Sequence, residues 1–213
     1  MRQWQSGGNC ISRTQNWAEL YRFLITLAKK CIVRHMYPKF FATKNLNKLK
    51  EVNEILGRDL QQIDVELFEP QGLDVAEIVK KKARDAFHKT GKFVLVEDTG
   101  LEFTAWKGLP GAFIKWFIQS VGNEGILKML EGEKNRKAIT KTAVGFYDGK
   151  DCHVFVGEVR GIIPNEIRGK GGFGWDPIFI PDNHTKSFAE MTSEEKNSVS
   201  MRKLALLQLK NFD

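Results

Sequence analysis

The chain has 213 residues, a length typical of one domain with a sizeable core. Apolar residues make up 42% of it and charged residues 28%, shares that exclude a disordered, collagen-like or fibrous protein. The formal net charge of +7 is the one unusual value. Taken by itself it favours a polyanionic partner such as nucleic acid, because clustered Lys and Arg side chains attract phosphates.

Cysteine usage and hydropathy restrict the setting of the protein. Cys10, Cys31 and Cys152 are an odd number at wide spacing, and no two of them are close enough for a zinc knuckle or a redox motif. We therefore expect a reducing intracellular setting, most simply the cytoplasm. The longest apolar stretch, residues 23–33, contains two lysines and is too short to span a bilayer, so no membrane partner is expected.

Most of the basic character lies in residues 1–35, which carry +5, whereas the rest of the chain carries +2. Apolar residues from Trp17 to Cys31 recur at helical spacing and predict an amphipathic helix. Three interpretations of this basic N-terminal extension stay open: an organelle-targeting peptide, a nucleic-acid-binding arm, or a leader without function. Met36 directly precedes the first convincing strand and is a candidate start for a domain over residues 36–213.

Beyond the basic extension, the sequence alternates between patterns typical of strands and of helices. Strands are predicted at residues 40–43, 94–97, 138–146 and 153–159, and helices at residues 45–56, 74–88 and about 192–209. Gly57 ends the first helix, and Thr192 with Glu195 forms a capping box for the last. A turn around Asp148 and Gly149 joins the last two strands as an antiparallel hairpin. The pattern predicts an α/β fold with a mixed sheet.

The polar loop between the first strand and the first helix, from Thr43 to Lys48, has the properties of a phosphate site. We expect unpaired backbone N–H groups at the start of this helix, and these groups, together with the positive end of the helix dipole, favour an anion. Thr43 and Asn45 add side-chain donors, and Lys44 and Lys48 add positive charge. The alternative is a capped surface helix with solvated lysines. The loop is not a P-loop, because the Gly-Lys-Ser/Thr sequence is missing.

Two carboxylates end the predicted strand at residues 94–97. Glu97 and Asp98 are expected at the carboxyl edge of the sheet, where α/β proteins bind ligands. Carboxylates at such an edge pair with a basic group, or hold a hard cation such as Mg²⁺ together with substrate phosphates. Glu69 and Glu102 are further candidates. The alternative is an Asp that caps a turn at the end of a strand.

The glycine-rich loop RGKGGFGWDP, residues 168–177, satisfies G-x-G-x-x-G without being a dinucleotide-binding fingerprint. That fingerprint opens a helix, whereas Asp176 before Pro177 is pushed away from helical geometry. The loop presents Phe173 and Trp175, which can stack on a base, and Asp176, which can accept from ring N–H groups. The alternative is a buried aromatic corner in which the glycines allow close packing.

Two basic residues lie near the start of the last predicted helix. Lys196 and Arg202 are six residues apart, so they would meet a ligand from different sides. The alternative is a solvated charged turn. A single ligand that has phosphates, a metal ion and a flat ring would explain all four groups of residues: the polar loop, the carboxylates, the glycine-rich loop and the two basic residues.

Five motifs, taken in order, resemble the inosine triphosphate pyrophosphatase family: TKNLNKLKEV, FVLVEDTGLEF, LPGAFIKWF, GKGGFGWDPIF and AEMTSEEKNSVSMRKLAL. The resemblance covers residues 39–213. It implies hydrolysis of ITP, dITP and XTP to the monophosphate and pyrophosphate, with Mg²⁺ as the cofactor and Mn²⁺ as a substitute for it. It also implies a homodimer of two-lobed α/β subunits, each with an elongated central sheet flanked by helices and an active site in the cleft between the lobes.

The family's functional residues can be carried onto matching positions of this sequence. The resemblance implies that Asp98 is the catalytic carboxylate and that Glu69 and Asp98 bind the metal. It implies substrate contacts from the polar loop, from the aromatic loop and from single residues elsewhere. By number these are Thr43, Lys44, Asn45, Leu46, Asn47, Lys48, Lys82, Asp98, Thr99, Phe173, Gly174, Trp175, Asp176, Lys196 and Arg202.

Two positions depart from the family pattern. Lys44 replaces the Gly of Thr-Gly-Asn, and Met201 replaces the His of Ser-His-Arg. Because Met201 cannot donate a hydrogen bond, we expect weaker discrimination against ATP than is usual in the family.

Two other functions stay open. One is a Maf-type pyrophosphatase that acts on modified pyrimidine triphosphates. The other is a basic nucleic-acid-binding module, for which the charge of +2 outside residues 1–35 gives little support.

Overall fold

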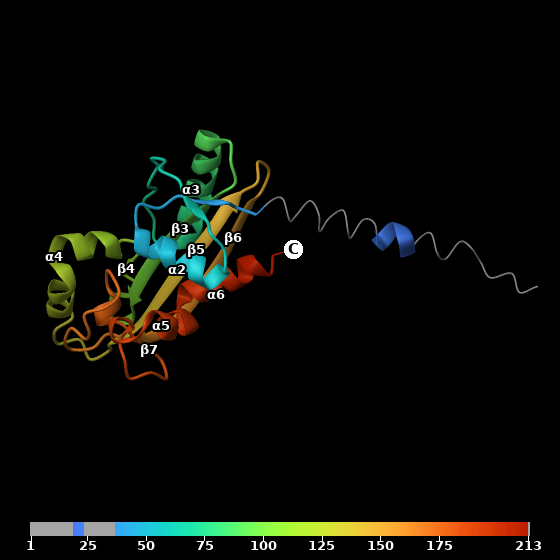
Figure 1. Cartoon of the computed structure of the whole chain (residues 1–213). Helices are drawn as coiled ribbons and strands as arrows, with labels where there is room; N and C mark the ends of the chain where they lie inside the picture. Colours follow the sequence, from blue (N-terminus) through green and yellow to red (C-terminus); the bar gives the residue numbers. More distant parts are fainter. Residues whose placement is uncertain (1–18, 24–36, 213) are drawn as a thin grey trace, which may run out of the picture. The chain divides into compact units, whose positions relative to one another are not determined.

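The computed structural model describes residues 19–23 and 37–212 (Figure 1). Residues 19–23 are helical and lie within the amphipathic helix predicted for the basic extension. The other residues of that extension, with two of the three cysteines and the candidate start Met36, lie outside the described residues. Residues Pro38–Phe212 form one compact unit. In the part of the chain that the structure describes, no helix is long and apolar enough to cross a membrane.

A mixed sheet forms the centre of this unit, as predicted. Its strands lie in the order β2 (Gln61–Gln62), β1 (Phe40–Phe41), β3 (Val94–Phe103), β5 (Lys137–Tyr147), β6 (Cys152–Ile162) and β7 (Ile180–Pro181), and β4 (Pro110–Gly111) pairs with β3. β1 is parallel to β2 and β3, whereas the strands from β3 to β7 pair antiparallel. The predicted hairpin is confirmed as β5 and β6. The division into two lobes around a cleft stays a prediction.

Side-chain caps fix the ends of two long helices. Asn45 caps α2 (Leu46–Leu56) and Asp74 caps α3 (Val75–Thr90), each side chain accepting from backbone N–H groups of the first turn. A glycine follows each helix, with φ of 62° after α2 and 63° after α3, a conformation that glycine adopts without strain. Both helices agree with the prediction to within two residues.

Strand β3 differs most from the prediction. It continues to Phe103, so Glu97 and Asp98 lie in its middle, opposite Val144 and Ala143 of β5. The expected position of these carboxylates at the carboxyl edge of the sheet is therefore wrong. Charged residues in the middle of a strand are tolerated here because successive side chains point to opposite faces, where different helices supply basic partners.

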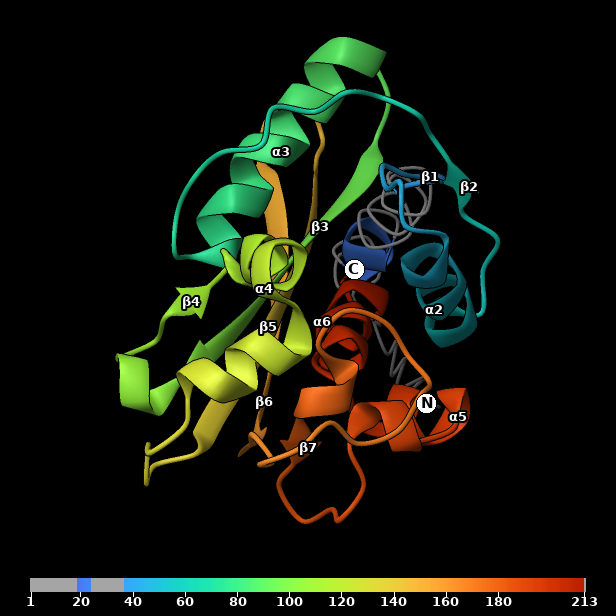
Figure 2. The ribbon, with the colours of Figure 1, turned by 90° about the vertical axis from the view of Figure 1, so that its left-hand side faces the viewer.

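Helices α3 and α6 (Met201–Lys210) cover opposite faces of the sheet (Figure 2). Val79 of α3 packs in one cluster with Val96 of β3, whereas Met201 of α6 packs in another with Leu101 of β3. Val96 and Leu101 are five positions apart on one strand, so their side chains point to opposite faces. The sheet is thus covered on both sides, as an α/β fold requires.

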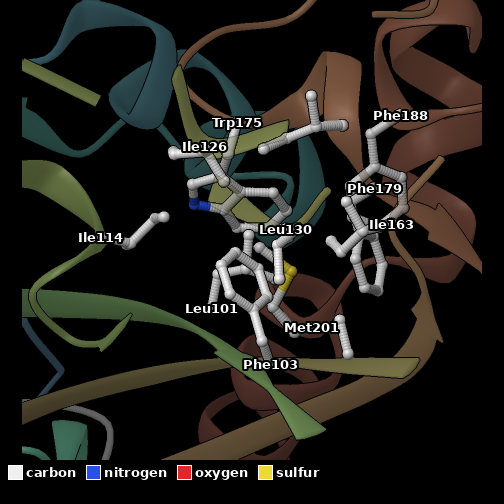
Figure 3. Close-up of a cluster of buried hydrophobic side chains, with 12 residues drawn as sticks. Leu101, Phe103, Ile114, Ile126, Leu130, Ile163, Trp175, Phe179, Phe188 and Met201 are labelled. Carbon is white, nitrogen blue, oxygen red and sulfur yellow. The ribbon is translucent and has the colours of Figure 1, made fainter. Parts of the chain in front are cut away.

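An apolar cluster lies where α4 (Ile114–Met129) and α6 meet the sheet (Figure 3). It contains Ile126 of α4, Met201 of α6 and Trp175 of the glycine-rich loop. The sequence patterns do not predict α4, because Gly122, at φ 68°, interrupts the helix and its apolar period.

The last predicted helix consists of two helices, α5 (Ser193–Val199) and α6. The predicted capping box opens α5. Ser200 then adopts an extended backbone with ψ of 151°, and its hydroxyl accepts from the N–H of Lys203 at 3.2 Å, which caps α6. The prediction of one continuous helix is wrong, and Lys196 and Arg202 belong to different helices. Short 3₁₀ turns lie at Thr104–Trp106, Asp176–Ile178 and Phe188–Glu190.

Candidate active site

A cavity of 1010 Å³ is lined by every predicted site residue of the chain. These residues are Thr43, Lys44, Asn45, Leu46, Asn47, Lys48, Glu69, Lys82, Asp98, Thr99, Phe173, Gly174, Trp175, Asp176, Lys196 and Arg202. Of the further candidates, Glu97 lines the cavity and Glu102 does not. Glu102 instead pairs with Lys141 of β5 at 2.8 Å, so its assignment to the site is wrong.

The polar loop before α2 forms one edge of the cavity. Asn45 Oδ1 accepts from the N–H groups of Asn47 and Lys48, at 3.0 and 3.3 Å. Thr43 Oγ1 accepts from the N–H of Asn45 at 3.1 Å, a turn that ends β1 two residues earlier than predicted. The expectation that these N–H groups are unpaired is therefore wrong. The loop would therefore attract an anion mainly through the positive charges of Lys44 and Lys48.

Lys82, Glu69 and Asp98 form the Lys82 cluster at another part of the cavity. Lys82 Nζ lies 3.3 Å from Glu69 Oε2 and 3.4 Å from Asp98 Oδ1, and donates to the backbone carbonyl of Glu97 at 3.3 Å. These distances are long for charge-assisted hydrogen bonds. Burial raises the pKa of Asp98, and the positive charges of Lys82 and Lys48 only partly offset that effect.

The chemistry of the Lys82 cluster fits a hard divalent cation. Oxygens of Glu69 and Asp98 converge on one positive charge, the Lys82 ammonium, and carboxylate oxygens are the ligands that Mg²⁺ prefers. Among the residues that the structure describes, no group of three or more His, Cys, Asp or Glu side chains could hold a metal alone. A cation here would need water and substrate oxygens as further ligands, which is usual for Mg²⁺.

Arg202, Glu97, Glu51, Lys196 and Asp176 form a second group, the Arg202 network. Arg202 is 1% exposed and binds both carboxylate oxygens of Glu97, at 2.7 and 2.9 Å. It also donates to Glu51, which accepts from Lys196 at 2.8 Å. Lys196 reaches Asp176 at 2.7 Å. Each of these charges has an opposite partner within the protein, so the network exists before any ligand binds.

The charges of the Arg202 network strongly affect each other's protonation. Burial alone would raise the pKa of Glu97, but the charges of Arg202 and Lys48 outweigh it and hold that pKa well below its usual range. Burial alone would lower the pKa of Arg202, but Glu97 and Glu51 outweigh it and raise that pKa. Burial raises the pKa of Asp176, and the positive charge of Lys196 only partly offsets that effect.

The prediction omits many of the residues at or near the cavity, and three of them, Lys115, Gln119 and Glu51, carry polar side chains from α4 and α2. Lys115 and Gln119 line the cavity from α4, whose existence the sequence patterns do not indicate. Glu51 supports the cavity through the Arg202 network. One weak signal pointed to it, because Glu51 follows Lys48 by three positions on α2 and so lies on the same side of that helix.

The glycine-rich loop contributes aromatic side chains to the cavity. Trp175 is 8% exposed and packs edge-to-face on Phe179, so most of its ring belongs to the apolar cluster in Figure 3. Phe173 is less buried, and Lys196 Nζ lies 4.5 Å from the centroid of its ring. A buried aromatic corner, the alternative interpretation, therefore describes Trp175 well. Phe173 is the ring more open to a ligand.

Known proteins similar to this chain identify its family. The model of the Ham1 family matches residues 39–212. The chain belongs to the Ham1 family. A dITP/XTP pyrophosphatase of Pyrobaculum aerophilum is 44% identical over 171 residues, which span 79% of this chain and 91% of that protein. An inosine triphosphate pyrophosphatase of Kluyveromyces lactis is 43% identical over 182 residues, which span 81% of this chain and 93% of that protein.

Solved structures of this family share the fold. A HAM1 protein from Coxiella burnetii has a TM-score of 0.72 and 31% identity, over 81% of this chain and 95% of that chain. The Ham1 protein of Staphylococcus aureus also has a TM-score of 0.72, with 26% identity over 81% of this chain and 96% of that chain. The predicted mixed α/β fold and the family resemblance are both confirmed.

Proposed function

We propose that this protein hydrolyses deaminated purine nucleoside triphosphates, namely ITP, dITP and XTP, to the monophosphate and pyrophosphate, and so removes them from the nucleotide pool. One observation carries the proposal: a single cavity joins a cluster suited to phosphates and a cation with a buried network and an aromatic ring suited to a base. The names of the relatives from Pyrobaculum aerophilum and Kluyveromyces lactis support this class of substrate.

The phosphates are expected to lie between the polar loop and the Lys82 cluster. Pyrophosphate is released when water attacks the α-phosphorus and the two outer phosphates leave together, so negative charge grows on the leaving oxygens. Lys48 and Lys82 line the cavity, and their positive charges would stabilise that negative charge. Lys44, which is exposed at the edge of the cavity, adds a further positive charge.

The carboxylates of the Lys82 cluster have separate tasks. Glu69 and Asp98 would hold Mg²⁺, or Mn²⁺ in its place, and the bound cation would neutralise phosphate charge. Asp98 is also the group that orients the attacking water and accepts its proton. Its raised pKa suits this task, because a stronger base takes a proton more readily. Thr99, beside Asp98, lines the cavity and is assigned to the substrate.

The base is expected to lie between Phe173 and the Arg202 network, with Gly174, Trp175 and Asp176 as its surroundings. Hypoxanthine and xanthine carry a carbonyl oxygen where adenine carries an amino group, so a donor such as Arg202 favours the first two and opposes adenine. Hydrogen bonds to Glu97 and Glu51 fix the position of the Arg202 guanidinium. Hydrogen bonds to Glu51 and Asp176 fix the Lys196 ammonium. A buried site of this kind discriminates by roughly 10⁴-fold, because the wrong base leaves donors unpaired.

The two alternative functions have less support. The relatives named above are, by their names, enzymes of purine nucleotides, which favours this class over a Maf-type pyrimidine enzyme. A nucleic-acid-binding module would need basic groups spread over one face, whereas the charge beyond residue 35 is only +2.

Two further parts of the proposal rest on the sequence alone, the first on the family resemblance and the second on the number and spacing of the cysteines. They are a homodimer and a cytoplasmic location, with residues 1–35 as an extension outside the catalytic domain. Light scattering on the purified chain would test the dimer. Imaging of the tagged protein with and without residues 1–35 would test the location and would show whether this extension directs the protein to an organelle.

A panel of nucleoside triphosphates with Mg²⁺ tests the proposed activity. The full chain and a chain that starts at Met36 are each given ITP, dITP, XTP, GTP, ATP and CTP, and the products are separated. We expect monophosphate and pyrophosphate from ITP, dITP and XTP, at equal rates for both chains. Release of orthophosphate, or a preference for CTP, would overturn the proposal.

A further inference from the structure

The segment between β2 and α3, residues 63–74, forms one wall of the cavity without being a helix or a strand. Most of its residues line the cavity, among them Glu66 and Glu69. The Glu69 side chain is 60% exposed, and its contact with Lys82 is 3.3 Å long. Neither regular backbone pairing nor burial therefore fixes the position of this carboxylate.

Helix α3 holds the segment at two further points. Asp85 Oδ2 accepts from the backbone N–H of Phe68 at 2.7 Å, and Lys89 Nζ donates to the backbone carbonyl of Glu66 at 2.6 Å. Lys89 and Asp85 also pair with each other at 2.8 Å. Lys82, Asp85 and Lys89 follow one another at spacings of three and four, which places them on one side of α3. That side of the helix therefore contacts the segment at three successive places.

The contacts of Asp85 and Lys89 with the segment are charge-assisted hydrogen bonds. Each involves an ionised side chain, and hydrogen bonds from or to a charged group are shorter and stronger than neutral ones. The hydrogen bond and charge of Lys89 lower the pKa of Asp85, so the carboxylate is ionised at neutral pH. The Phe68 side chain is 64% exposed, so its ring does not anchor the segment. The backbone of residue 68, directly before Glu69, is held by Asp85 instead.

We propose that Asp85 and Lys89 are positioning residues, which hold residues 63–74 against α3 so that Glu69 faces Lys82 and Asp98. This inference deepens the proposed function and rests on it where it concerns Mg²⁺. Neither residue lines the cavity. They act through Glu69. Their loss is therefore expected to raise the concentrations of Mg²⁺ and substrate that half-saturate the enzyme, and to change kcat at saturation much less.

Two variants test the inference, Asp85→Ala and Lys89→Ala. Lys89 is 43% exposed on its side chain, so its replacement leaves the core intact. Hydrogen exchange on residues 64–70 should accelerate by roughly tenfold. In Asp85→Ala the Phe68 N–H loses its charged acceptor, and in Lys89→Ala that acceptor loses its ion-pair partner. The free Mg²⁺ that half-saturates ITP hydrolysis should rise by roughly fivefold to tenfold, with kcat at saturating Mg²⁺ and ITP within about twofold of the wild type.

Two control variants separate positioning from general damage to α3. Glu77→Ala removes another exposed ion pair of the same helix, Glu77 with Lys80 at 2.5 Å, whose partner is not in residues 63–74. It should leave both the exchange and the Mg²⁺ requirement unchanged. Asp85→Asn keeps an oxygen that can accept from Phe68 but loses the charge, so its values should lie between those of the wild type and Asp85→Ala.

The outcomes distinguish this inference from the proposed function. If Asp85→Ala and Lys89→Ala leave the exchange of residues 64–70 unchanged, or accelerate it without raising the Mg²⁺ requirement, the positioning role is wrong while the activity stands. If the wild type does not hydrolyse ITP, the proposed function fails, and the exchange experiment still decides whether α3 holds this segment. An equal effect of Glu77→Ala would also overturn the positioning role.

Discussion

The two ends of the cavity hold their charges in different ways. In the Arg202 network, the contacts of Arg202 with Glu97 are 2.7 and 2.9 Å, and Arg202 is 1% exposed. In the Lys82 cluster, the contacts are 3.3 and 3.4 Å, and the Glu69 side chain is 60% exposed. The first group is compact and buried, whereas the second is loose and open on one side.

A single strand supplies both ends. Glu97 and Asp98 are neighbours on β3, so their side chains point to opposite faces, one toward Arg202 of α6 and the other toward Lys82 of α3. The difference suggests a division of tasks: a fixed set of donors selects the base, and a set of loosely paired charges receives the phosphates and cation. Each variant below changes one end, and the acid titration compares the two ends directly.

The largest effect is expected at the Lys82 cluster. Asp98→Asn keeps the shape of the side chain but removes the charge, so kcat for pyrophosphate release from ITP should fall by about 10³-fold. The thermal midpoint should not fall, because burial disfavours the charged form of Asp98. If this variant kept near-wild-type turnover, the assignment of Asp98 as the catalytic carboxylate would be wrong.

At the other end, the main effect of a similar change is on stability. Arg202→Ala leaves the buried Glu97 with Lys48 as its remaining cation, at 3.0 Å, and should lower the free energy of unfolding by about 3–5 kcal/mol. Denaturant titration measures this change. Arg160→Ala is the matched control, because Arg160 pairs with Glu158 at the surface, with 73% of its side chain exposed, and should cost less than about 1 kcal/mol. If both variants lost the same free energy of unfolding, the buried network would contribute no more to stability than a surface ion pair.

Acid should separate the two ends without any mutation. The pKa of Asp98 is raised, so this carboxylate protonates before Glu97 as pH falls, and kcat/KM for ITP should then drop by about tenfold per pH unit. The pKa of Glu97 is lowered, so the stability from its ion pairs is present above the usual carboxyl range and is lost only as pH falls toward the lowered pKa.

An interval of pH should therefore exist in which the protein is folded and inactive. Near-ultraviolet circular dichroism and rate measurements on the same samples would detect it, and activity should return at neutral pH. Loss of structure and activity at the same pH would contradict the division between the two ends.

The smallest effect is expected from the departure at residue 201. Met201 is 2% exposed and packs in the apolar cluster beside Trp175, although it also lines the cavity. Met201→His adds a donor and should raise the ratio of kcat/KM for ITP over ATP by roughly threefold to tenfold, the value of one hydrogen bond. Met201→Leu, which adds no donor, should leave the ratio unchanged. If both variants changed it equally, side-chain shape rather than hydrogen bonding would control selectivity.

Local signals in the sequence predicted some elements well and others poorly. The start of α2 follows from Asn45, and that of α3 from Asp74, because a capping side chain acts on its own neighbours. The length of β3 could not be predicted in this way. Glu97 and Asp98 are stabilised inside that strand by Arg202 and Lys82, which are distant in the sequence.

The candidate site shows the same limit. The polar loop, the aromatic loop and the carboxylates could each be recognised from residue types, but each had an ordinary structural explanation, and only the order of the motifs tied them together. The signal for Glu51 was weak, its position three residues after Lys48, since a glutamate on an amphipathic helix is normally solvated. Its role arises from Lys196 and Arg202, which reach it from two other helices.

The ratio of kcat/KM for ITP over ATP, measured in the wild type and in Lys82→Met, tests the central claim most directly. The Lys82 ammonium pairs with the carboxylates of the phosphate end and contacts Glu97 only at its backbone carbonyl, so its loss should lower both values of kcat/KM by the same factor. The wild type should strongly prefer ITP, and the variant should keep that preference. A wild type that uses ATP as well as ITP, or a ratio that changes in Lys82→Met, would contradict the account.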